Sequence, residues 1–467
     1  MPSSALPPVL RAIEEALASA TAFALRRGSR VDPASLVVTV ALSGGRDSMV
    51  LLDALAATAA ARGVALTAAH VHHGLSPNAD RWAEFCAAEC ARRGIPLALR
   101  HVRVENTAAL GIEAGARAAR YRVFASLAAD FIAVAHHADD QAETVLLQLL
   151  RGSGPHGLAA MPLIRPMPSG GALLRPLIAL HNATLRSYAE ARGLAWIEDE
   201  SNDDRSLRRN FLRHEIAPRL AAAFPGYPAT LARGAQLQSE AAAMLDDLAA
   251  IDAREALRDG DGMRPELERR VYAELAERAP QRARNLLRWF LRLNGLRSPS
   301  AARLDAMQRQ LAQANDDARV RLAHDGIEIG IHRGRIVIHP PAIAPFFADW
   351  HGEPAIALPH GRLEFAPTHG AGLAAARLAA ASVVVRPRSG GERIRIDRDR
   401  PRQAVKRLLQ AAGIPHWQRD ALPFVWCGDS LAAVPGLGVD VMFAAGTGES
   451  GFDIRWHPEN WVRRPVS

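Results

Sequence analysis

The chain has almost no lysine. Of its 57 lysine and arginine residues, Lys406 is the single lysine, and every other strong base is an arginine. This scarcity excludes the phosphate-binding motif GxxxxGK[ST], whose lysine contacts the phosphates. Cysteine is scarce as well: Cys86, Cys90 and Cys427 are too few for a disulfide framework and match no zinc-binding spacing. We therefore expect a protein of a reducing compartment, the cytoplasm.

Long apolar runs are also missing. No stretch of about 18 apolar residues predicts a membrane span, so no membrane partner is expected. Glu14 and Glu15 interrupt the apolar stretch near the N-terminus, which argues against a signal peptide. The formal net charge of +8 favours a polyanionic partner, although the arginine and alanine bias of a GC-rich coding sequence would also raise it.

The first half of the chain alternates β-rich apolar runs with helical patterns. Strands are expected at residues 36–42, 65–71, 97–104 and 131–136, each followed by a helix, at 47–60, 78–93, 113–129 and 139–150. Such alternation is typical of parallel βαβ units with helices on both faces. We predict an α/β catalytic domain over residues 1–225, with a Rossmann-like doubly wound parallel sheet that binds ligands beyond the carboxyl ends of its strands.

Two further domains are expected after this one. Residues 226–345 are mainly helical in pattern and close with a short β tract at 320–340. Pro340, Pro341 and Pro345 mark a linker. Residues 346–467 combine β-rich runs with a helix through QAVKRLLQAAG, which predicts a small α+β domain.

A glycine-rich loop, Ser43-Gly44-Gly45-Arg46-Asp47-Ser48, joins the first expected strand to its helix. Glycines let the main chain approach an oxyanion closely, and the start of a helix presents bare N–H groups to negative charge. The serines add hydroxyl donors, and Asp47 can hold Mg²⁺ near the phosphates. A plain strand-to-helix turn would also need glycine, but the spacing SGGxDS resembles the pyrophosphate-binding loop (PP-loop) of the N-type ATP pyrophosphatases.

A second polar segment follows the fourth expected strand. His136, Asp140 and Glu143 are spaced at i, i+4 and i+7 across the strand end and the first helical turns. Acids at a helix N-terminus suit the helix dipole alone. Facing a phosphate loop, however, they are what Mg-ATP and an incoming ammonium group both require. On the preceding helix, Arg117 can bind phosphate or form a plain intrahelical ion pair with Glu113.

Further motifs follow in a fixed order, namely HVHHGLS, GIEAGARAARY, HHADDQAET, RGSGPHGL, LLRPL, WIEDESNDDRSLRRNFLRHEIAP, VRPRSGGERIR and KRLLQAAGIPHWQRDALPFV. With the PP-loop they resemble the tRNA(Ile)-lysidine synthetase family over the whole chain. The resemblance implies an ATP- and Mg²⁺-dependent ligation. The C2 oxygen of the wobble cytidine, in the CAU anticodon of tRNA(Ile), attacks the α-phosphate of ATP and pyrophosphate leaves. Free L-lysine then displaces AMP through its ε-amine, so that the tRNA reads AUA rather than AUG.

The resemblance also implies roles for matching residues. The catalytic residues would be Asp47, Arg117, Asp140 and Glu143, with Asp47 and Asp140 on the metal or the lysine ammonium. The nucleotide would contact Ser43, Gly44, Gly45, Arg46, Asp47, Ser48 and His136. The RNA would contact Arg205, Arg208, Arg209 and Arg213, although helix capping and ion pairs with Glu198 to Glu200 would also explain these residues. It would also contact a basic C-terminal helix with Arg402, Lys406, Arg407 and Arg419, although a solvated helix face would explain that pattern too. A homodimer is also implied.

The residues alone leave rival functions to consider. A PP-loop tRNA thiolase adenylates a similar carbonyl and then delivers sulfur, which requires a CxxC pair or cluster cysteines. Cys86 and Cys90 form a CxxxC pair in a helical pattern and are expected in the core. A basic RNA-binding module without catalysis would explain the charge, but it has no use for an acidic segment beside a phosphate loop.

Overall fold

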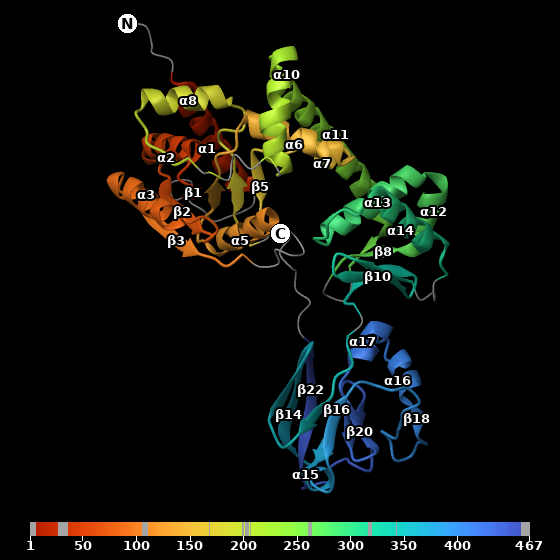
Figure 1. The fold of residues 1–467 in the computed structure, drawn as a ribbon. Coiled ribbons are helices and arrows are strands. Elements are labelled where there is room, and N and C mark those ends of the chain that lie inside the picture. The colour runs from red at the N-terminus through yellow and green to blue at the C-terminus, as the bar shows by residue number, and fades with distance from the viewer. Residues whose placement is uncertain are drawn as a thin grey trace. The chain divides into compact units, whose positions relative to one another are not determined.

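The structure is a computed structural model, and it forms two compact units (Figure 1). The division falls between Asp247 and Leu248, inside one long helix. The predicted domain boundaries near residues 225 and 345 stay predictions. The residues described are 6–26, 36–104, 111–167, 169–198, 200, 205, 207–259, 264–315, 320–341 and 343–458. Among them, no helix combines the length and the apolar character that a membrane span needs.

A six-stranded sheet forms the centre of the first unit, in the order β3-β2-β1-β4-β6-β5. Its strands are β1 (Val37–Ala41), β2 (Ala65–His72), β3 (Leu97–His101), β4 (Phe131–Ala133), β5 (Ile164–Pro166) and β6 (Ala172–Leu174). Neighbours pair in parallel from β3 to β6, and β5 is an antiparallel edge strand. The predicted parallel sheet is confirmed. Its strand order reverses between β1 and β4, and in such sheets the ligand crevice opens at that switch point.

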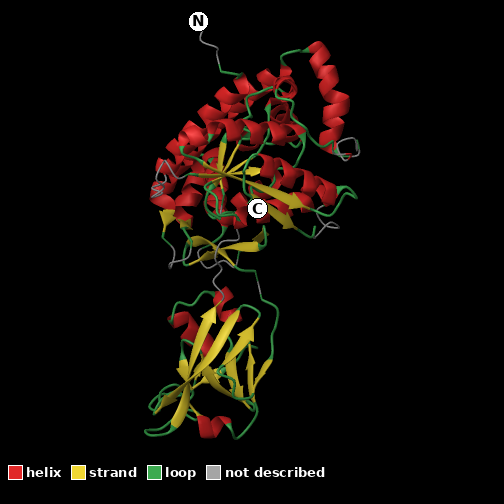
Figure 2. Cartoon of the chain, turned by 90° about the vertical axis from the view of Figure 1, so that its left-hand side faces the viewer, coloured by secondary structure: helices red, strands yellow, loops and turns green. Residues whose placement is uncertain are grey.

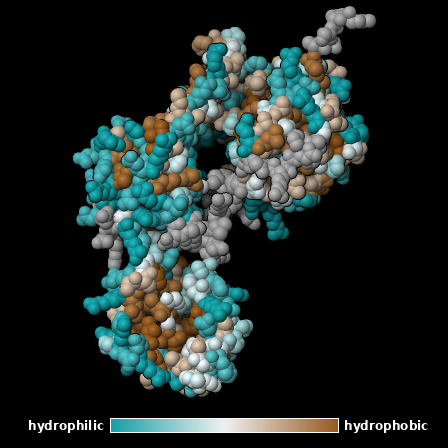
Figure 3. Space-filling view, turned by 180° about the vertical axis from the view of Figure 1, so that it is seen from behind, coloured by the Kyte–Doolittle hydropathy of each residue, from teal (hydrophilic) through white to brown (hydrophobic). Residues whose placement is uncertain are grey.

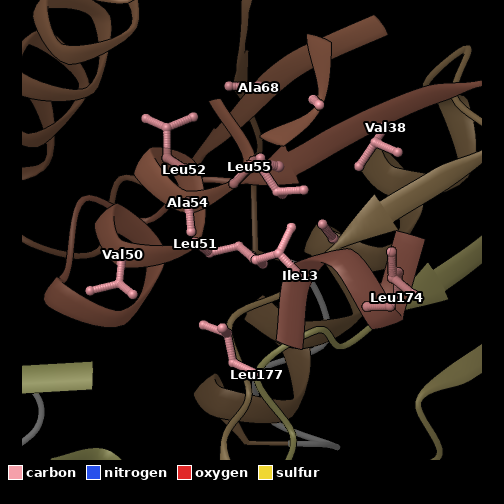
Figure 4. Close-up of a cluster of buried hydrophobic side chains, with 14 of the residues drawn as sticks. Ile13, Val38, Val50, Leu51, Leu52, Ala54, Leu55, Ala68, Leu174 and Leu177 are labelled. Carbon is pink, nitrogen blue, oxygen red and sulfur yellow. The ribbon is translucent and has the colours of Figure 1, made fainter. Parts of the chain in front are cut away.

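Helices cover both faces of this sheet, as predicted. They are α1 (Pro8–Arg26), α2 (Arg46–Thr58), α3 (Ala79–Arg92), α5 (Ile112–Ser126), α6 (Ala138–Leu150) and α8 (Asn182–Ala191). Ile13 of α1 and Leu51 of α2 lie in one buried cluster (Figure 4), to which Phe131 of β4 also belongs. The next residue, Ile132, packs instead with Phe124 of α5. Because successive side chains of a strand point to opposite faces, α5 lies on the face away from α1 and α2.

Two short elements lie between those of the sheet, a 3₁₀ turn (Ala60–Arg62) and α7 (Pro155–Leu158). After α8 the chain continues through α9 (Arg208–Phe211), a π-helical turn (Leu212–Ile216), α10 (Ala217–Ala223) and the long α11 (Tyr227–Ala256). The π-helical turn directly continues α9. Such turns are rare and are frequent at functional sites.

The second unit begins with three helices on an antiparallel sheet, in the order β7-β8-β11-β10-β9. The elements are β7 (Leu257–Arg258), β8 (Glu266–Glu268), α12 (Arg269–Arg278), α13 (Pro280–Leu293), α14 (Ala301–Gln313), β9 (Arg321–His324), β10 (Ile327–His332) and β11 (Arg335–His339). Phe290 of α13 and Ile329 of β10 share one buried cluster. The helical prediction missed β7 and β8 because two or three residues are too few to show a strand pattern.

The C-terminal part is mostly β, as Figure 2 shows. Its sheets have the orders β12-β16-β19-β20-β21, β13-β14-β22-β15 and β17-β18. Their strands are β12 (Ala348–Trp350), β13 (Ala355–Leu358), β14 (Gly361–His369), β15 (Leu373–Ala374), β16 (Val383–Arg386), β17 (Arg393–Ile394), β18 (Gln403–Ala404), β19 (Phe424–Cys427), β20 (Ser430–Val434), β21 (Gly438–Val439) and β22 (Ser450–Pro458). Phe365 of β14 and Val385 of β16 pack together between the two larger sheets.

The predicted basic C-terminal helix is not one helix. The helices of this part are α15 (Ala375–Leu378), α16 (Val405–Ala411) and α17 (His416–Ala421). Lys406 and Arg407 lie on α16, Arg402 precedes β18, and Arg419 lies on α17. Gly413, at φ +73°, separates the two helices. A left-handed glycine just after a helix ends it, and the prediction overlooked this signal.

Candidate active site at the carboxyl ends of β1 and β4

The predicted PP-loop lies directly after β1. Gly44 has φ +87°, and a Cβ atom there would lie 2.5 Å from Cδ1 of Ile197, so only glycine fits. The hydroxyl of Ser48 accepts a hydrogen bond from the Gly44 N–H (3.1 Å) and donates one to the Gly45 carbonyl (2.8 Å). Helix α2 then starts without a side-chain cap. Its first N–H groups are therefore arranged as in a phosphate-binding helix N-terminus.

His137 is the residue that joins the PP-loop to the acidic segment. It is the N-cap of α6, and its backbone N–H donates to Oδ2 of Asp140 (3.1 Å). Its Nε2 lies 3.5 Å from Oδ2 of Asp47 and 3.5 Å from Oδ2 of Asp140, and its Nδ1 lies 3.5 Å from Oδ2 of Asp139. The predicted approach of the acidic segment to the PP-loop is thus present in the structure, through a residue that sequence reasoning missed.

The neighbouring His136 was predicted to contact the nucleotide, and that role stays a prediction. Its Nδ1 is buried and has no hydrogen-bond partner in the described part of the chain. Burial lowers the pKa of His136 to about 3. The charge of Asp140 opposes this shift, and those of Arg175, Arg209 and Arg117 add to it. His136 is therefore neutral at physiological pH, with positive charges around it.

The charges around His137 stabilise one another. Burial disfavours its imidazolium form, but hydrogen bonds to Asp139 and Asp47 and the charge of Asp140 raise the pKa of His137 to about 10. Burial also disfavours the ionised form of Asp47, yet His137 and Arg46 hold its pKa below the usual value. The hydrogen bond to His137 lowers the pKa of Asp139 to about 2. At neutral pH, Asp47 and Asp139 are therefore ionised around one imidazolium.

Two arginines clamp the predicted acids from the other side. Glu143 is only 6% exposed and accepts from Arg209 Nε (2.8 Å) and from Arg213 Nε (2.7 Å) and Nη2 (3.1 Å). Arg213 Nη2 also donates to Oδ1 of Asp140 (3.1 Å). Glu143 is thus a neutralised, positioned carboxylate. The repeat of arginine at i and i+4 was the signal for Arg213, which sequence reasoning did not use in the site.

Other predicted site residues lie apart from this centre. Arg117 donates to the hydroxyl of Tyr121 (3.3 Å), and among the described residues no hydrogen bond or ion pair joins it to the PP-loop. Arg205 pairs with Glu215 at 2.6 Å, and Arg208 is exposed. Arg209 was predicted to contact RNA, but its guanidinium is engaged by the buried acids. The roles predicted for these arginines stay predictions.

The residues of the C-terminal part that were predicted to contact RNA differ in whether they already pair with an acid. Arg402 lies 3.6 Å from the carboxylate of Asp440, which is fully buried. Lys406 and Arg407 are exposed on α16. Of these three, the two on α16 therefore remain available to an external partner.

A PP-loop opposed by carboxylates, at the switch point of a doubly wound parallel sheet, defines a PP-loop ATP pyrophosphatase. Family models agree, because residues 23–220 match "PP-loop domain", residues 272–337 match "TilS substrate binding domain" and residues 383–456 match "TilS substrate C-terminal domain". The chain belongs to the tRNA(Ile)-lysidine synthase family.

Curated relatives carry the same family name over nearly their whole length. The tRNA(Ile)-lysidine synthase of Azoarcus sp. is 42% identical, covering 92% of this chain and 94% of its own. That of Nitrosomonas europaea is 40% identical, with coverages of 90% and 92%. Among solved structures, the U34-tRNA thiolase NcsA from Methanococcus maripaludis has a TM-score of 0.38 and 20% identity, and covers 48% of this chain and 78% of its own. That likeness is too low to carry an argument.

Proposed function

We propose that the chain ligates L-lysine to C2 of the wobble cytidine in the CAU anticodon of tRNA(Ile), with ATP cleaved to AMP and pyrophosphate. Family membership supports the substrate assignment. The observation that carries the chemistry is the 3.5 Å approach of His137 to both Asp47 and Asp140. This approach supports the proposal because it brings a phosphate-binding loop close to carboxylates, and adenylation of a carbonyl oxygen followed by its displacement by an amine uses both.

In the first step, the cytidine O2 forms a bond to the α-phosphorus of ATP, and the bond to the β-phosphate oxygen breaks. The departing pyrophosphate carries its charge to the start of α2. There the uncapped N–H groups can donate to its oxygens, and the Ser43 hydroxyl can exchange its bond to Ser48 Oγ for one to the pyrophosphate. The carbonyl oxygen at C2 now carries AMP and has become a good leaving group.

The residues present fit a magnesium ion. Mg²⁺ prefers one or two carboxylates together with phosphate oxygens and water, and Asp47 and Asp140 supply two such carboxylates on either side of His137. When bound, Mg²⁺ would neutralise charge on the phosphates of ATP. We propose that these two carboxylates hold it.

In the second step, the ε-amine of lysine forms the C–N bond and AMP leaves with the C–O bond electrons. The ammonium form must first lose a proton, which a nearby carboxylate can accept. Asp47 and Asp139 attract the ammonium group electrostatically, and Asp140 does so although it also pairs with Arg213 at 3.1 Å. Glu143 is more fully neutralised, with short bonds to two arginines. We infer that Glu143 acts by positioning Asp140 rather than by taking the proton.

The thiolase alternative conflicts with the cysteines. Cys86, Cys90 and Cys427 are all buried and free. Burial raises the pKa of Cys86 to about 12 and that of Cys90 to about 11, so both stay protonated at neutral pH. The thiolate is the form that attacks or binds metal, and these thiols are poorly suited to sulfur transfer.

Mass spectrometry tests the proposed function directly. A tRNA(Ile) transcript with a CAU anticodon is incubated with ATP, Mg²⁺ and isotope-labelled lysine, then digested to nucleosides. We expect one labelled cytidine derivative at the wobble position, with AMP and pyrophosphate in equal amounts. Labelled sulfur in the nucleoside when a sulfur donor is supplied, and none from lysine, would favour the thiolase instead.

We also propose that Lys406 and Arg407 contact the tRNA backbone. Both are exposed, although Figure 3 shows a hydrophobic region on one face of this domain, so its surface is not uniformly basic. Replacing both by alanine should weaken tRNA binding and lower its salt dependence by about 0.7 to 0.9 per lost phosphate contact, without changing the KM for ATP. From the family resemblance we further propose a cytoplasmic homodimer, to be tested by light scattering.

A further inference from the structure

Arg175 is a fully buried arginine at the carboxyl end of β6. Its exposed fraction is 2%, and it is one of the largest fully buried side chains. One guanidinium nitrogen, Nη1, donates to the carbonyl of Pro162 (2.7 Å), but Nε has no hydrogen-bond partner in the described part of the chain. Burial lowers its pKa to about 10. A buried charge without a counter-charge is costly, which calls for an explanation.

Two further guanidinium groups lie beside Arg175, around Tyr121 of α5. The Cζ atoms of Arg117 and Arg165 are each 5.2 Å from the centre of the Tyr121 ring. The Tyr121 hydroxyl also interacts with Arg175 and accepts from Arg117. Within the described residues, none of the three arginines forms an ion pair with an acid. We call Tyr121, Arg117, Arg165 and Arg175 the Tyr121 cluster.

The Tyr121 cluster has surplus positive charge, which is unfavourable until an anion binds. Three like charges this close repel one another, and the low polarity around Arg175 strengthens that repulsion. Arg117 is exposed and Arg165 is half-buried, so the cluster is open to solvent on their side. An anion with several oxygens, such as a phosphate group, could accept hydrogen bonds from more than one guanidinium.

The position of the Tyr121 cluster indicates which phosphate it binds. Its buried arginine follows β6, which pairs in parallel with β4, and β4 pairs with β1. The PP-loop follows β1 and already has its own donors for the pyrophosphate of ATP. The cluster therefore lies on the same edge of the sheet as the PP-loop, beyond the acidic segment. A single-stranded RNA loop brings one negative phosphate per nucleotide to that place.

We propose that the Tyr121 cluster binds a backbone phosphate of the RNA next to the reacting nucleotide and thereby positions its base opposite the PP-loop. The proposal rests on the proposed function, because it takes RNA as the second substrate. Arg165 and Arg175 hold the phosphate with Arg117, and Tyr121 orients the guanidinium groups.

The test compares Arg165→Gln with a matched control, Arg186→Gln, which replaces an exposed arginine on α8 at the other face of the sheet. We expect Arg165→Gln to raise the dissociation constant for tRNA by about tenfold to a hundredfold, the range for one charge-assisted contact. The slope of log Kd against log salt should fall by about 0.7. The affinity for ATP without tRNA should not change, and the control should match the wild type in both assays.

Results that differ from these expectations separate a failure of the Tyr121 cluster proposal from a failure of the proposed function. A loss of ATP affinity without tRNA would show that the anion is a nucleotide phosphate, which overturns the proposal. So would tRNA binding equal to that of the control. If the wild-type protein forms no lysine adduct on tRNA, the proposed function fails before any variant is compared.

A second variant guards against loss of folding at the buried position. Arg175→Met keeps an unbranched side chain at the buried position but is shorter and removes the guanidinium with its charge. We expect normal ATP affinity, which reports an intact first unit, together with weakened tRNA binding. Tyr121→Phe, which removes only the hydroxyl, should raise the KM for tRNA with little change in kcat, because it disturbs orientation and not charge. Unchanged tRNA binding in Arg175→Met with intact ATP binding contradicts the proposal.

Discussion

Arg213→Gln should destabilise the first unit measurably. The variant removes two hydrogen bonds to Glu143, of 2.7 and 3.1 Å, and one of 3.1 Å to Asp140. Breaking a fully buried ion pair costs about 3 to 5 kcal/mol. Because the Arg213 side chain is 37% exposed and Arg209 still pairs with Glu143, we expect a smaller loss, about 2 kcal/mol.

Calorimetry can measure this loss in the full chain. For a unit of about 250 residues, 1 kcal/mol shifts the melting temperature by about 2 to 4 °C, so Arg213→Gln should melt about 4 to 8 °C lower. The transition of the first unit is recognised because ATP, which the PP-loop binds, shifts it upward. The activity should fall as well, since Asp140 loses a positioning contact.

A double-mutant cycle with Glu143→Gln separates this ion pair from general damage. If the two side chains interact as the structure shows, the double variant should lose less than the sum of the single variants, with a coupling of about 1 to 2 kcal/mol. Additive losses, or a melting temperature of Arg213→Gln equal to that of the wild type, would refute the reasoning.

Three further predictions concern the loop and the cysteines. Gly44→Ala should lower tRNA-dependent pyrophosphate release about tenfold while tRNA binding persists, because left-handed backbone costs alanine about 1 to 2 kcal/mol and the new Cβ would displace the end of the Ile197 side chain. Full activity would contradict this. Asp47→Asn should raise the Mg²⁺ concentration for half-maximal rate roughly tenfold or more, and an unchanged Mg²⁺ titration argues against it. Cys86 and Cys90, with pKa values of about 12 and 11, should resist alkylation near pH 8.5 in the native protein and react quickly in guanidinium. Rapid labelling of these two cysteines in the native protein would show that their thiols are not buried.

Much of the first unit could be predicted from local patterns. The apolar run before Ser43 became β1, and the glycine loop became the PP-loop, because burial on both faces and a left-handed backbone leave direct marks in the residue types. The pattern of βαβ units predicted a doubly wound parallel sheet, but it did not predict the exact order of the strands or the position of the reversal beside β1. The two-residue and three-residue strands β7 and β8 carried no such mark and were missed.

The partners of the charged residues could not be predicted in the same way. His136 and His137 are adjacent and chemically identical, and only the start of α6 turns the second toward Asp47. Arg213 and Glu143 are 70 residues apart along the chain. Nothing in either local pattern distinguishes an arginine that pairs with a buried acid from one that contacts RNA.

The sequence by itself determined the phosphate loop, the parallel α/β class and the acidic segment, because each depends on backbone conformation and side-chain polarity within a few residues. Only the tertiary structure decided that His137 bridges the carboxylates, that arginines neutralise Glu143, and that Arg175 has no counter-charge among the residues the structure describes. Electrostatic energy depends on distance and burial in space, and separation along the chain does not report either one.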